Sequence, residues 1–301
     1  MASITRRNAL KSAGLGVAAL GMSGTGMSGT GMSGTMVTNL ASGVPPIVPA
    51  DRQFGTLRVG MASYSMHKFG YPAVLAACRR LGIHQLSLKD AHLPLTSTAE
   101  EIESALQAAQ AAEVAITSCG VVYLKDDDAS MQKALDYAHA LRVGVMVIGV
   151  SHAMLPRLDR VVKRNPSQLK LAIHNHGPND KLFPSPLEVY RAVQGLDRRI
   201  GLCMDLGHTF RMHENLIADL NHTRDRLYSI HFKDLESGDV KARGVPVGTG
   251  ALPTIPVLRH LGAMPYTGEV QLEYESEEDD PIPGMAESFG FMRGVLQAGR
   301  G

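Results

Sequence analysis

The chain has 301 residues, of which 44% are hydrophobic, and this is enough for one large domain with a buried core. Its formal net charge of +1 and the absence of long Lys/Arg runs argue against nucleic acid as a partner. Tryptophan is absent and aromatic residues make up only 5% of the chain, so we expect neither a stacking platform for bases nor an aromatic sugar-binding face.

The first residues resemble an export signal. Arg6 and Arg7 precede a weakly apolar run at residues 13–20, an order that is typical of a signal peptide. The adjacent arginines resemble the twin-arginine signal, which the machinery that exports folded proteins recognises. The apolar run is too short to span a bilayer comfortably, so no stable membrane span is expected. We predict an exported, periplasmic protein, tethered if the signal stays uncleaved; a chance basic N-terminus is the alternative interpretation.

A low-complexity linker follows this signal. The pentapeptide Gly-Met-Ser-Gly-Thr occurs three times between Gly21 and Thr35, and three prolines follow before residue 50. Gly/Ser/Thr-rich sequence of this kind cannot bury a core and is typical of a flexible spacer. The sequence therefore predicts a signal and linker over residues 1–52 and a folded domain over residues 53–301.

From residue 57 onward, short apolar runs alternate with amphipathic segments. The predicted strands cover residues 57–62, 84–88, 114–119, 145–150, 169–174, 200–205, 228–232 and 269–274. The predicted helices cover residues 72–81, 98–112, 129–141, 154–163, 186–194, 214–220, 252–261 and 285–296. Helix-start signals support two of them, because Thr98 lies in a capping pattern and Pro186 follows Ser185.

Strands that alternate with helices predict a parallel sheet. Eight such units in roughly 240 residues match an α/β fold of the (β/α)8 or TIM barrel type. A doubly wound open sheet is the alternative, but no GxGxxG motif follows the first strand. The apolar segments also contain the three cysteines, Cys78, Cys119 and Cys203, which we interpret as buried free thiols.

Ionisable residues occur at the ends of the last four predicted strands. The fifth ends at His174, the sixth ends at Asp205, the seventh contains His231 and the eighth contains Glu273. A TIM barrel carries its active site at these strand ends. A lone strand-end histidine is more often structural, but four unpaired ionisable groups would repel or need desolvation, and a divalent cation resolves that conflict. Two imidazoles with two carboxylates suit Mn²⁺, Co²⁺, Fe²⁺ or Zn²⁺ better than Ca²⁺ or Mg²⁺.

The period of two along a strand sharpens the choice of ligands. His174 and His176 share a face, but we expect the chain to turn at Gly177, so His174 is the predicted ligand and His176 a substrate contact. Glu273 is preferred to Glu275, which opens an acidic run typical of a solvated loop. Further substrate contacts are predicted at Tyr64, Lys89, His92 and Arg211.

Five short segments occur in a fixed order, at residues 172–178, 205–208, 231–234, 245–250 and 272–275. Together they resemble the xylose isomerase-like TIM barrels, the sugar phosphate isomerase/epimerase superfamily, over about residues 57–293. The resemblance implies one divalent metal, usually Mn²⁺, Co²⁺ or Mg²⁺, held by His174, Asp205, His231 and Glu273, and we expect Mn²⁺. It also implies that His208 contacts substrate and that Lys233 and Lys89 face substrate oxygens.

One position departs from this resemblance. Many epimerases and isomerases of the superfamily have Glu where this chain has His174, and the epimerases pass a proton between two metal-bound glutamates through a cis-enediolate. An imidazole that coordinates metal has its lone pair occupied and is a poor base. This argues against two-base epimerisation and leaves Glu273 as the one carboxylate base, for aldose–ketose isomerisation or for loss of water or an alkoxide beside a ketone.

The predicted mechanism begins with a metal that polarises a substrate carbonyl, after which Glu273 or a histidine such as His208 removes the adjacent proton. The enediolate is then held by the metal and by Lys233 or Lys89. The predicted function is a sugar isomerase or epimerase acting on a small sugar or keto-sugar.

Three other functions are alternatives to this one. A dehydratase or lyase would be similar to the inosose dehydratases or 3-keto-glycoside lyases. An abasic-site endonuclease of the related barrel type would need more metal ligands and a basic groove. A non-catalytic sugar-binding barrel would hold metal without turnover. The sequence leaves open whether the chain forms a homo-oligomer.

Overall fold

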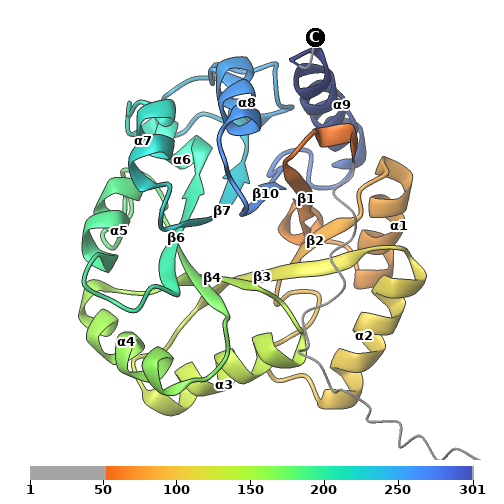
Figure 1. Cartoon of the computed structure of the whole chain (residues 1–301). Helices are drawn as coiled ribbons and strands as arrows, with labels where there is room; N and C mark the ends of the chain where they lie inside the picture. Colours follow the sequence, from red (N-terminus) through yellow and green to blue (C-terminus); the bar gives the residue numbers. More distant parts are fainter. Residues whose placement is uncertain (1–51, 300–301) are drawn as a thin grey trace, which may run out of the picture. The chain divides into compact units, whose positions relative to one another are not determined.

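The computed structural model describes residues 52–299, in which eight parallel strands close into a barrel surrounded by helices (Figure 1). The barrel strands are β1 (Arg58–Ala62), β2 (Gln85–Leu88), β3 (Ala115–Tyr123), β4 (Val145–Gly149), β5 (Lys170–His174), β6 (Ile200–Asp205), β7 (Leu227–Phe232) and β10 (Glu269–Leu272). Neighbouring strands follow the chain order, and β10 pairs with β1 to close the ring. The predicted single-domain (β/α)8 barrel is confirmed, whereas the predicted signal and linker lie outside the described residues, apart from Arg52.

The helices follow the strands in the order that the sequence predicts. They are α1 (Tyr71–Leu81), α2 (Ala99–Ala111), α3 (Asp128–Ala140), α4 (Leu155–Arg164), α5 (Pro186–Val193), α6 (Leu206–Arg211), α7 (Leu216–Thr223), α8 (Thr254–Ala263) and α9 (Ile282–Ala298). Three short 3₁₀ turns, η1 (Arg52–Phe54), η2 (Ser63–Met66) and η3 (His152–Met154), complete the described elements. None of the helices within residues 52–299 combines the length and apolar composition that crossing a bilayer requires.

The structure differs from the prediction at a few element ends. β3 continues to Tyr123 instead of stopping at Cys119, because apolar residues resume after Gly120. β10 stops at Leu272, so Glu273 is the first residue after the last strand. Besides the 3₁₀ turns, three elements were not predicted: α6, which begins directly after β6, and the two strands of an antiparallel pair, β8 (Asp234–Leu235) and β9 (Gly244–Val245).

Side-chain caps fix where several helices begin. Thr98 Oγ1 accepts a hydrogen bond from the Glu101 amide at 3.2 Å, and the Glu101 carboxylate accepts one from the Thr98 amide at 2.8 Å. Such a reciprocal cap contributes about 1 kcal/mol. Ser185 caps α5 just before Pro186, because its Oγ accepts a hydrogen bond from the Glu188 amide at 3.3 Å. Asp205 caps α6, because its Oδ1 accepts from the His208 amide at 2.8 Å, which leaves Oδ2 for other partners.

The barrel interior explains why the strand-end side chains meet. Val147, Ala172 and Cys203 belong to a small apolar cluster on neighbouring strands, separate from the larger core cluster. Because residues i and i+2 share a face of a strand, His174 lies one step beyond Ala172, and Asp205 one step beyond Cys203. The apolar layer therefore ends in an ionisable layer at the C-terminal ends of the strands.

Candidate metal centre

The four predicted ligands converge at the C-terminal end of the barrel. His174 ends β5, Asp205 ends β6, His231 lies near the end of β7 and Glu273 follows β10. All four side chains are buried, and one donor atom from each lies within 4.8 Å of the donors of the other three. The pairing of Asp205 with His231 across β6 and β7 brings two of them to the same level.

Nitrogen and oxygen atoms face one another across this centre. His174 Nε2 lies 3.1 Å from His231 Nδ1 and 3.5 Å from Asp205 Oδ2. His231 Nδ1 lies 3.2 Å from Glu273 Oε2. Burial lowers the pKa of His174 to about 3, so this ring is neutral at physiological pH and offers a lone pair.

This donor set fits a divalent cation. Two donors bound to one ion at about 2.0–2.2 Å lie at most ~4.4 Å apart, so a span of 4.8 Å has to close only slightly. Asp205 Oδ2 is fully buried and faces only groups of the centre, with His174 Nε2 at 3.5 Å and the Lys233 ammonium at 3.0 Å. Burial alone would lower the pKa of His231, but Cys203 and Glu273 hold it well above its usual value, so one shared proton bridges this ring and the neutral His174 ring at 3.1 Å. An ion would replace that proton and use the lone pairs of both nitrogens. Two nitrogens with two carboxylates suit a transition metal.

Lys233 adds a positive charge to the same centre. Its Nζ lies 3.0 Å from Asp205 Oδ2, 2.8 Å from Glu273 Oε2 and 2.7 Å from Glu275 Oε2. Burial alone would lower the pKa of Lys233, but these carboxylates hold it well above its usual value. Burial alone would also raise the pKa of Asp205 and Glu273, but Lys233 and the neighbouring histidines hold both well below their usual values. Both carboxylates and the ammonium are therefore charged at neutral pH.

Asn175 holds the end of β6 from behind the centre. Its Oδ1 accepts a hydrogen bond from the Asp205 amide at 3.0 Å, and its Nδ2 donates to Thr209 Oγ1 at 3.2 Å. Thr209 Oγ1 in turn donates to the Asp205 carbonyl at 2.6 Å. The sequence analysis assigned Asn175 no role, although its alternation with His174 and His176 signals that it faces away from the centre.

Cys203 lies next to the two histidines. One nitrogen each of His174 and His231 and the Cys203 sulfur form a second set of donors within 4.8 Å of one another. Cys203 is buried and free, as predicted. The sequence analysis treated it as part of the core and did not identify it as a soft donor beside the candidate ligands.

His208 and Arg211 form a pair beside the centre. Arg211 Nη1 donates to His208 Nδ1 at 3.2 Å, and Arg211 Nη2 donates to the Ala242 carbonyl at 2.8 Å. Burial lowers the pKa of His208 to about 4, so its ring is neutral at physiological pH. Because arginine can only donate, His208 accepts at Nδ1 and carries its proton on Nε2. In this arrangement His208 is a hydrogen-bond donor rather than a base.

His176 is engaged on both sides of its ring. Its Nδ1 lies 3.0 Å from Asp180 Oδ2, and its Nε2 lies 3.0 Å from the Tyr123 hydroxyl. The chain turns directly after it, as expected, because Gly177 adopts a φ of +80°. The role of His176 as a substrate contact stays a prediction. Tyr123 and Asp180 were not identified from the sequence, because no motif connects Tyr123 with a histidine on another strand.

The ends of β1 and β2 place the remaining predicted contacts. Lys89 Nζ lies 5.8 Å from the centroid of the Tyr64 ring. Burial and the nearby carboxylates of the centre raise the pKa of Tyr64. His92 has its ring nitrogens 3.0 Å from Ser63 Oγ and 3.2 Å from the Met66 carbonyl. Tyr64 and Lys89 therefore lie near the centre, whereas both nitrogens of His92 contact the turn after β1.

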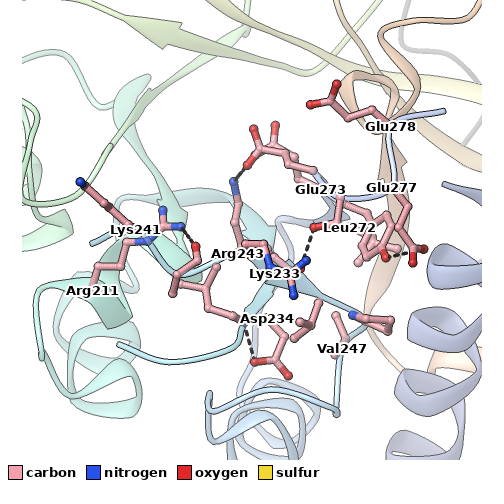
Figure 2. Close-up of a pocket in the computed structure, with 18 of the residues that line it drawn as sticks. Arg211, Lys233, Asp234, Lys241, Arg243, Val247, Leu272, Glu273, Glu277 and Glu278 are labelled. Carbon is pink, nitrogen blue, oxygen red and sulfur yellow. Dashed lines mark hydrogen bonds and ion pairs between the residues drawn. The ribbon is translucent and has the colours of Figure 1, made fainter. Parts of the chain in front are cut away.

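A hollow of about 740 Å³, here called the polar hollow, is lined by Lys233 and Glu273 among other residues (Figure 2). Figure 2 shows Arg211 and Lys241 on one side of these two residues and Glu277 on the other. Charged groups of both signs can form hydrogen bonds with a polyhydroxylated molecule, and this volume is within the usual range of small-molecule sites.

Asp234 ties the wall of the polar hollow to the end of β7. Its carboxylate accepts hydrogen bonds from the amides of Leu235, Gly248, Gly250 and Leu252 at 2.9–3.1 Å. These amides are occupied within the protein, so the glycine-containing loop is a structural loop rather than a cradle for phosphate.

Together these features define a (β/α)8 barrel whose strand ends hold a candidate centre of two histidines and two carboxylates. The chain belongs to the xylose isomerase-like TIM barrel family, whose model matches residues 75–295. No curated protein matches the chain in sequence.

Solved structures with low sequence identity share this fold. A 3-keto-D-glucoside 4-epimerase from E. coli is 15% identical, with a TM-score of 0.64 over 79% of this chain and 99% of that one. A probable 3-DHS dehydratase involved in petrobactin synthesis from Bacillus anthracis is 11% identical, with a TM-score of 0.63 over 76% and 97%. A xylose isomerase-like TIM barrel protein from Mycobacterium smegmatis in complex with magnesium is 14% identical, with a TM-score of 0.63 over 82% and 100%.

Proposed function

We propose that this protein is a divalent-metal-dependent isomerase or epimerase that acts on a small sugar or keto-sugar through an enediolate. The observation that carries the proposal is an ionised, buried carboxylate, Glu273, which lies 2.8 Å from a buried ammonium, Lys233, within a donor set that fits a metal. Family membership and the fold shared with a keto-glucoside epimerase support it. Mn²⁺ is the ion we propose.

The chain's own residues supply the proton transfer. When bound, a divalent ion would polarise a substrate carbonyl as a Lewis acid. Glu273 accepts the proton from the adjacent carbon, and the C–H electron pair becomes the double bond of an enediolate while the carbonyl oxygen gains negative charge. Lys233, already fixed and charged beside Glu273, stabilises that oxygen. Glu273 returns its proton to the former carbonyl carbon, while the neighbouring hydroxyl passes its proton to the former carbonyl oxygen. The new C=O then lies on the carbon that first lost its proton, which completes the isomerisation.

The residues around Glu273 favour one-base chemistry. His174 takes part in the candidate centre with Nε2, so its lone pair is unavailable as a second base once an ion is bound. His208 presents an N–H at Nε2 and can donate to a substrate oxygen. A single base returns the proton on the side from which it was removed, which favours aldose–ketose isomerisation over epimerisation.

A lyase is the second candidate. A further hollow of about 380 Å³, lined in part by His174 and His208, lies beside the centre and gives a leaving group space. In this reaction Glu273 removes the same proton, but the electron pair then expels a substituent on the next carbon, and the departing oxygen takes a proton. The fold shared with a dehydratase supports this candidate.

Exchange of the substrate C–H in D₂O tests the shared first step. The full chain, loaded with Mn²⁺, is incubated with a panel of ketoses and 3-keto-glucosides, and recovered sugars are analysed by mass spectrometry. We expect deuterium at the carbon beside the carbonyl, and loss of exchange in Glu273→Gln even at Mn²⁺ concentrations that saturate the variant. Interconversion without fragmentation assigns an isomerase, and release of a second fragment assigns a lyase. Stoichiometric metal without exchange on any sugar would refute both.

We also propose that the protein acts in the periplasm after twin-arginine export. Arg6 and Arg7, which carry this proposal, lie outside the described residues. Fractionation of cells that express the full chain tests it, with the double variant Arg6→Lys and Arg7→Lys as the comparison. We expect the variant to accumulate in the cytoplasm; equal periplasmic amounts would refute this export route.

A further inference from the structure

Exposed apolar side chains gather beside the candidate centre. Among the described residues, four large hydrophobic side chains are exposed: Tyr123, Leu182, Val240 and Ile255. Two of them, Tyr123 at 63% and Leu182 at 39%, line the same hollow of about 380 Å³. We call it the apolar hollow. His174 is also part of its lining, so a molecule held at the centre can reach into it.

The Tyr123 ring is fixed in place although it is exposed. Its hydroxyl donates to His176 Nε2 at 3.0 Å, and His176 Nδ1 donates to Asp180 Oδ2 at 3.0 Å. The Tyr123 and His176 rings stack with their planes 25° apart. On another side the Tyr123 ring packs so closely on Gly149 that even a Cβ atom there would overlap it. The ring is therefore a rigid surface rather than a freely rotating side chain.

The same carboxylate also positions Leu182. Asp180 Oδ1 accepts a hydrogen bond from the Leu182 amide at 2.8 Å, while its Oδ2 holds His176. The Leu182 carbonyl lies 2.8 Å from His152 Nε2. The two apolar walls thus depend on one partly buried hydrogen-bond network. Ordering exposed apolar side chains in this way costs conformational entropy, which a surface residue without a function does not require.

We propose that the apolar hollow binds an aryl substituent of a keto-glycoside whose sugar ring lies at the metal centre. The proposal rests on the keto-sugar form of the proposed function, because a glycoside offers no free anomeric carbonyl for aldose–ketose isomerisation, and it names the substrate class. Tyr123 and Leu182 offer exposed apolar surface that a ring can cover, and the buried Phe183 and Val150 also line the hollow. The hydrogen-bonding atoms of His176 and Asp180 are occupied by each other and by Tyr123 and the loop, which leaves chiefly Asn179 and, next to the centre, His208 to bind hydroxyl groups in this hollow. A second, hydroxyl-rich sugar would therefore replace few of its bonds to water.

Equilibrium binding tests this without any turnover. Calorimetry on the Mn²⁺-loaded full chain compares phenyl and methyl β-D-glucopyranoside, and the same pair of galactosides and mannosides. We expect the phenyl member of at least one pair to bind about tenfold more tightly, which is the effect of one covered aromatic contact. Equal affinity within every pair, or no binding of any phenyl glycoside, would overturn the proposal.

Variants locate the preference. Tyr123→Ala and Leu182→Ala should each remove most of it, whereas Tyr123→Phe keeps the ring and should retain it. Ile255→Ala, at a comparably exposed position on α8 outside the hollow, is the matched control and should change nothing. Metal content and far-ultraviolet circular dichroism verify that each variant is folded. A preference that survives both alanine variants would show that the aryl group binds elsewhere.

The proposal and the proposed function can fail separately. If the phenyl preference depends on Tyr123 but no 3-keto-glucoside exchanges deuterium, the subsite stands and the enolising function falls. If phenyl and methyl 3-keto-glucosides bind and react equally, the function stands and the subsite falls. A disaccharide that binds as tightly as the phenyl glycoside and loses affinity in Tyr123→Ala would replace the aryl group by a second sugar ring and refute the aryl assignment.

Discussion

Replacing Lys233 by Met tests whether the ammonium and a metal ion neutralise the same two carboxylates. Lys233 Nζ lies 3.0 Å from Asp205 Oδ2 and 2.8 Å from Glu273 Oε2, inside the protein. At an effective dielectric constant of about 20, each contact corresponds to roughly 5–6 kcal/mol of Coulomb energy, most of which offsets desolvation. Removing one partner of such a buried pair costs about 3–5 kcal/mol. We expect the metal-free variant to lose this much of its free energy of unfolding in urea.

Adding Mn²⁺ should restore much of the loss, because the ion would neutralise the carboxylates that Lys233 has left. The stabilisation by saturating metal should therefore be larger in Lys233→Met than in the unchanged protein. Lys68→Met is the matched control: Lys68 Nζ lies 3.0 and 2.9 Å from Glu278 and Asp279, but this pair is exposed and its loss should not be measurable. A metal-free loss below about 1 kcal/mol, or equal stabilisation by Mn²⁺ in both proteins, would refute the shared-carboxylate argument.

Three further predictions concern the same centre. Asp205→Asn should lower bound metal well below one ion per chain, measured by elemental analysis after gel filtration; full occupancy would remove Asp205 from the ligand set. Asn175→Ala leaves the Asp205 amide without its acceptor and should cost about 1–3 kcal/mol in urea unfolding, whereas a neutral result would show that water replaces the side chain. The folded-state pKa values of His174 (about 3) and His208 (about 4) lie below the unfolded value of about 6.5. As pH falls below 6.5, both histidines take up a proton in the unfolded state but not yet in the folded state. The free energy of unfolding of the metal-free protein should therefore fall by about 2 kcal/mol between pH 6 and pH 5, and by about half of that in His208→Gln. A flat profile would contradict the burial of these rings.

The sequence predicts the fold because the apolar runs, the helical segments and their order along the chain all indicate the same architecture. Apolar runs alternate with helical segments, and this order permits only a parallel sheet with helices outside it. The errors are local and have physical causes. The third strand was predicted to end at Cys119, but it continues through Gly120 to Tyr123. α6 was missed because it has no linker before it: Asp205 ends β6 and caps the helix with the same side chain.

The candidate ligands were predictable for a related reason. In a parallel barrel every strand ends at the same rim, so residues at strand ends meet even when they are far apart in the sequence. The residues that position them could not be found in this way. Asn175 contacts Asp205 from the outer face of its strand. Tyr123 reaches His176 from another strand, and no spacing within the chain encodes that contact.

His174 links the charge of the centre to the proposed chemistry. An ion that takes the lone pairs of His174 and His231 would leave both rings neutral, so that Asp205, Glu273 and Lys233 together contribute one negative charge. A divalent ion would turn this into one positive charge. A glutamate in place of His174 would add one negative charge and bring the total to zero. With the neutral imidazole at this position, the positive charges of the ion and Lys233 would exceed the negative charges of the two carboxylates by one. An enediolate is the species in the reaction that carries the opposite charge, and a buried centre stabilises it more strongly than it stabilises a neutral sugar. Histidine at position 174, where many related enzymes have the second glutamate base, therefore also favours the enediolate intermediate on which one-base chemistry depends.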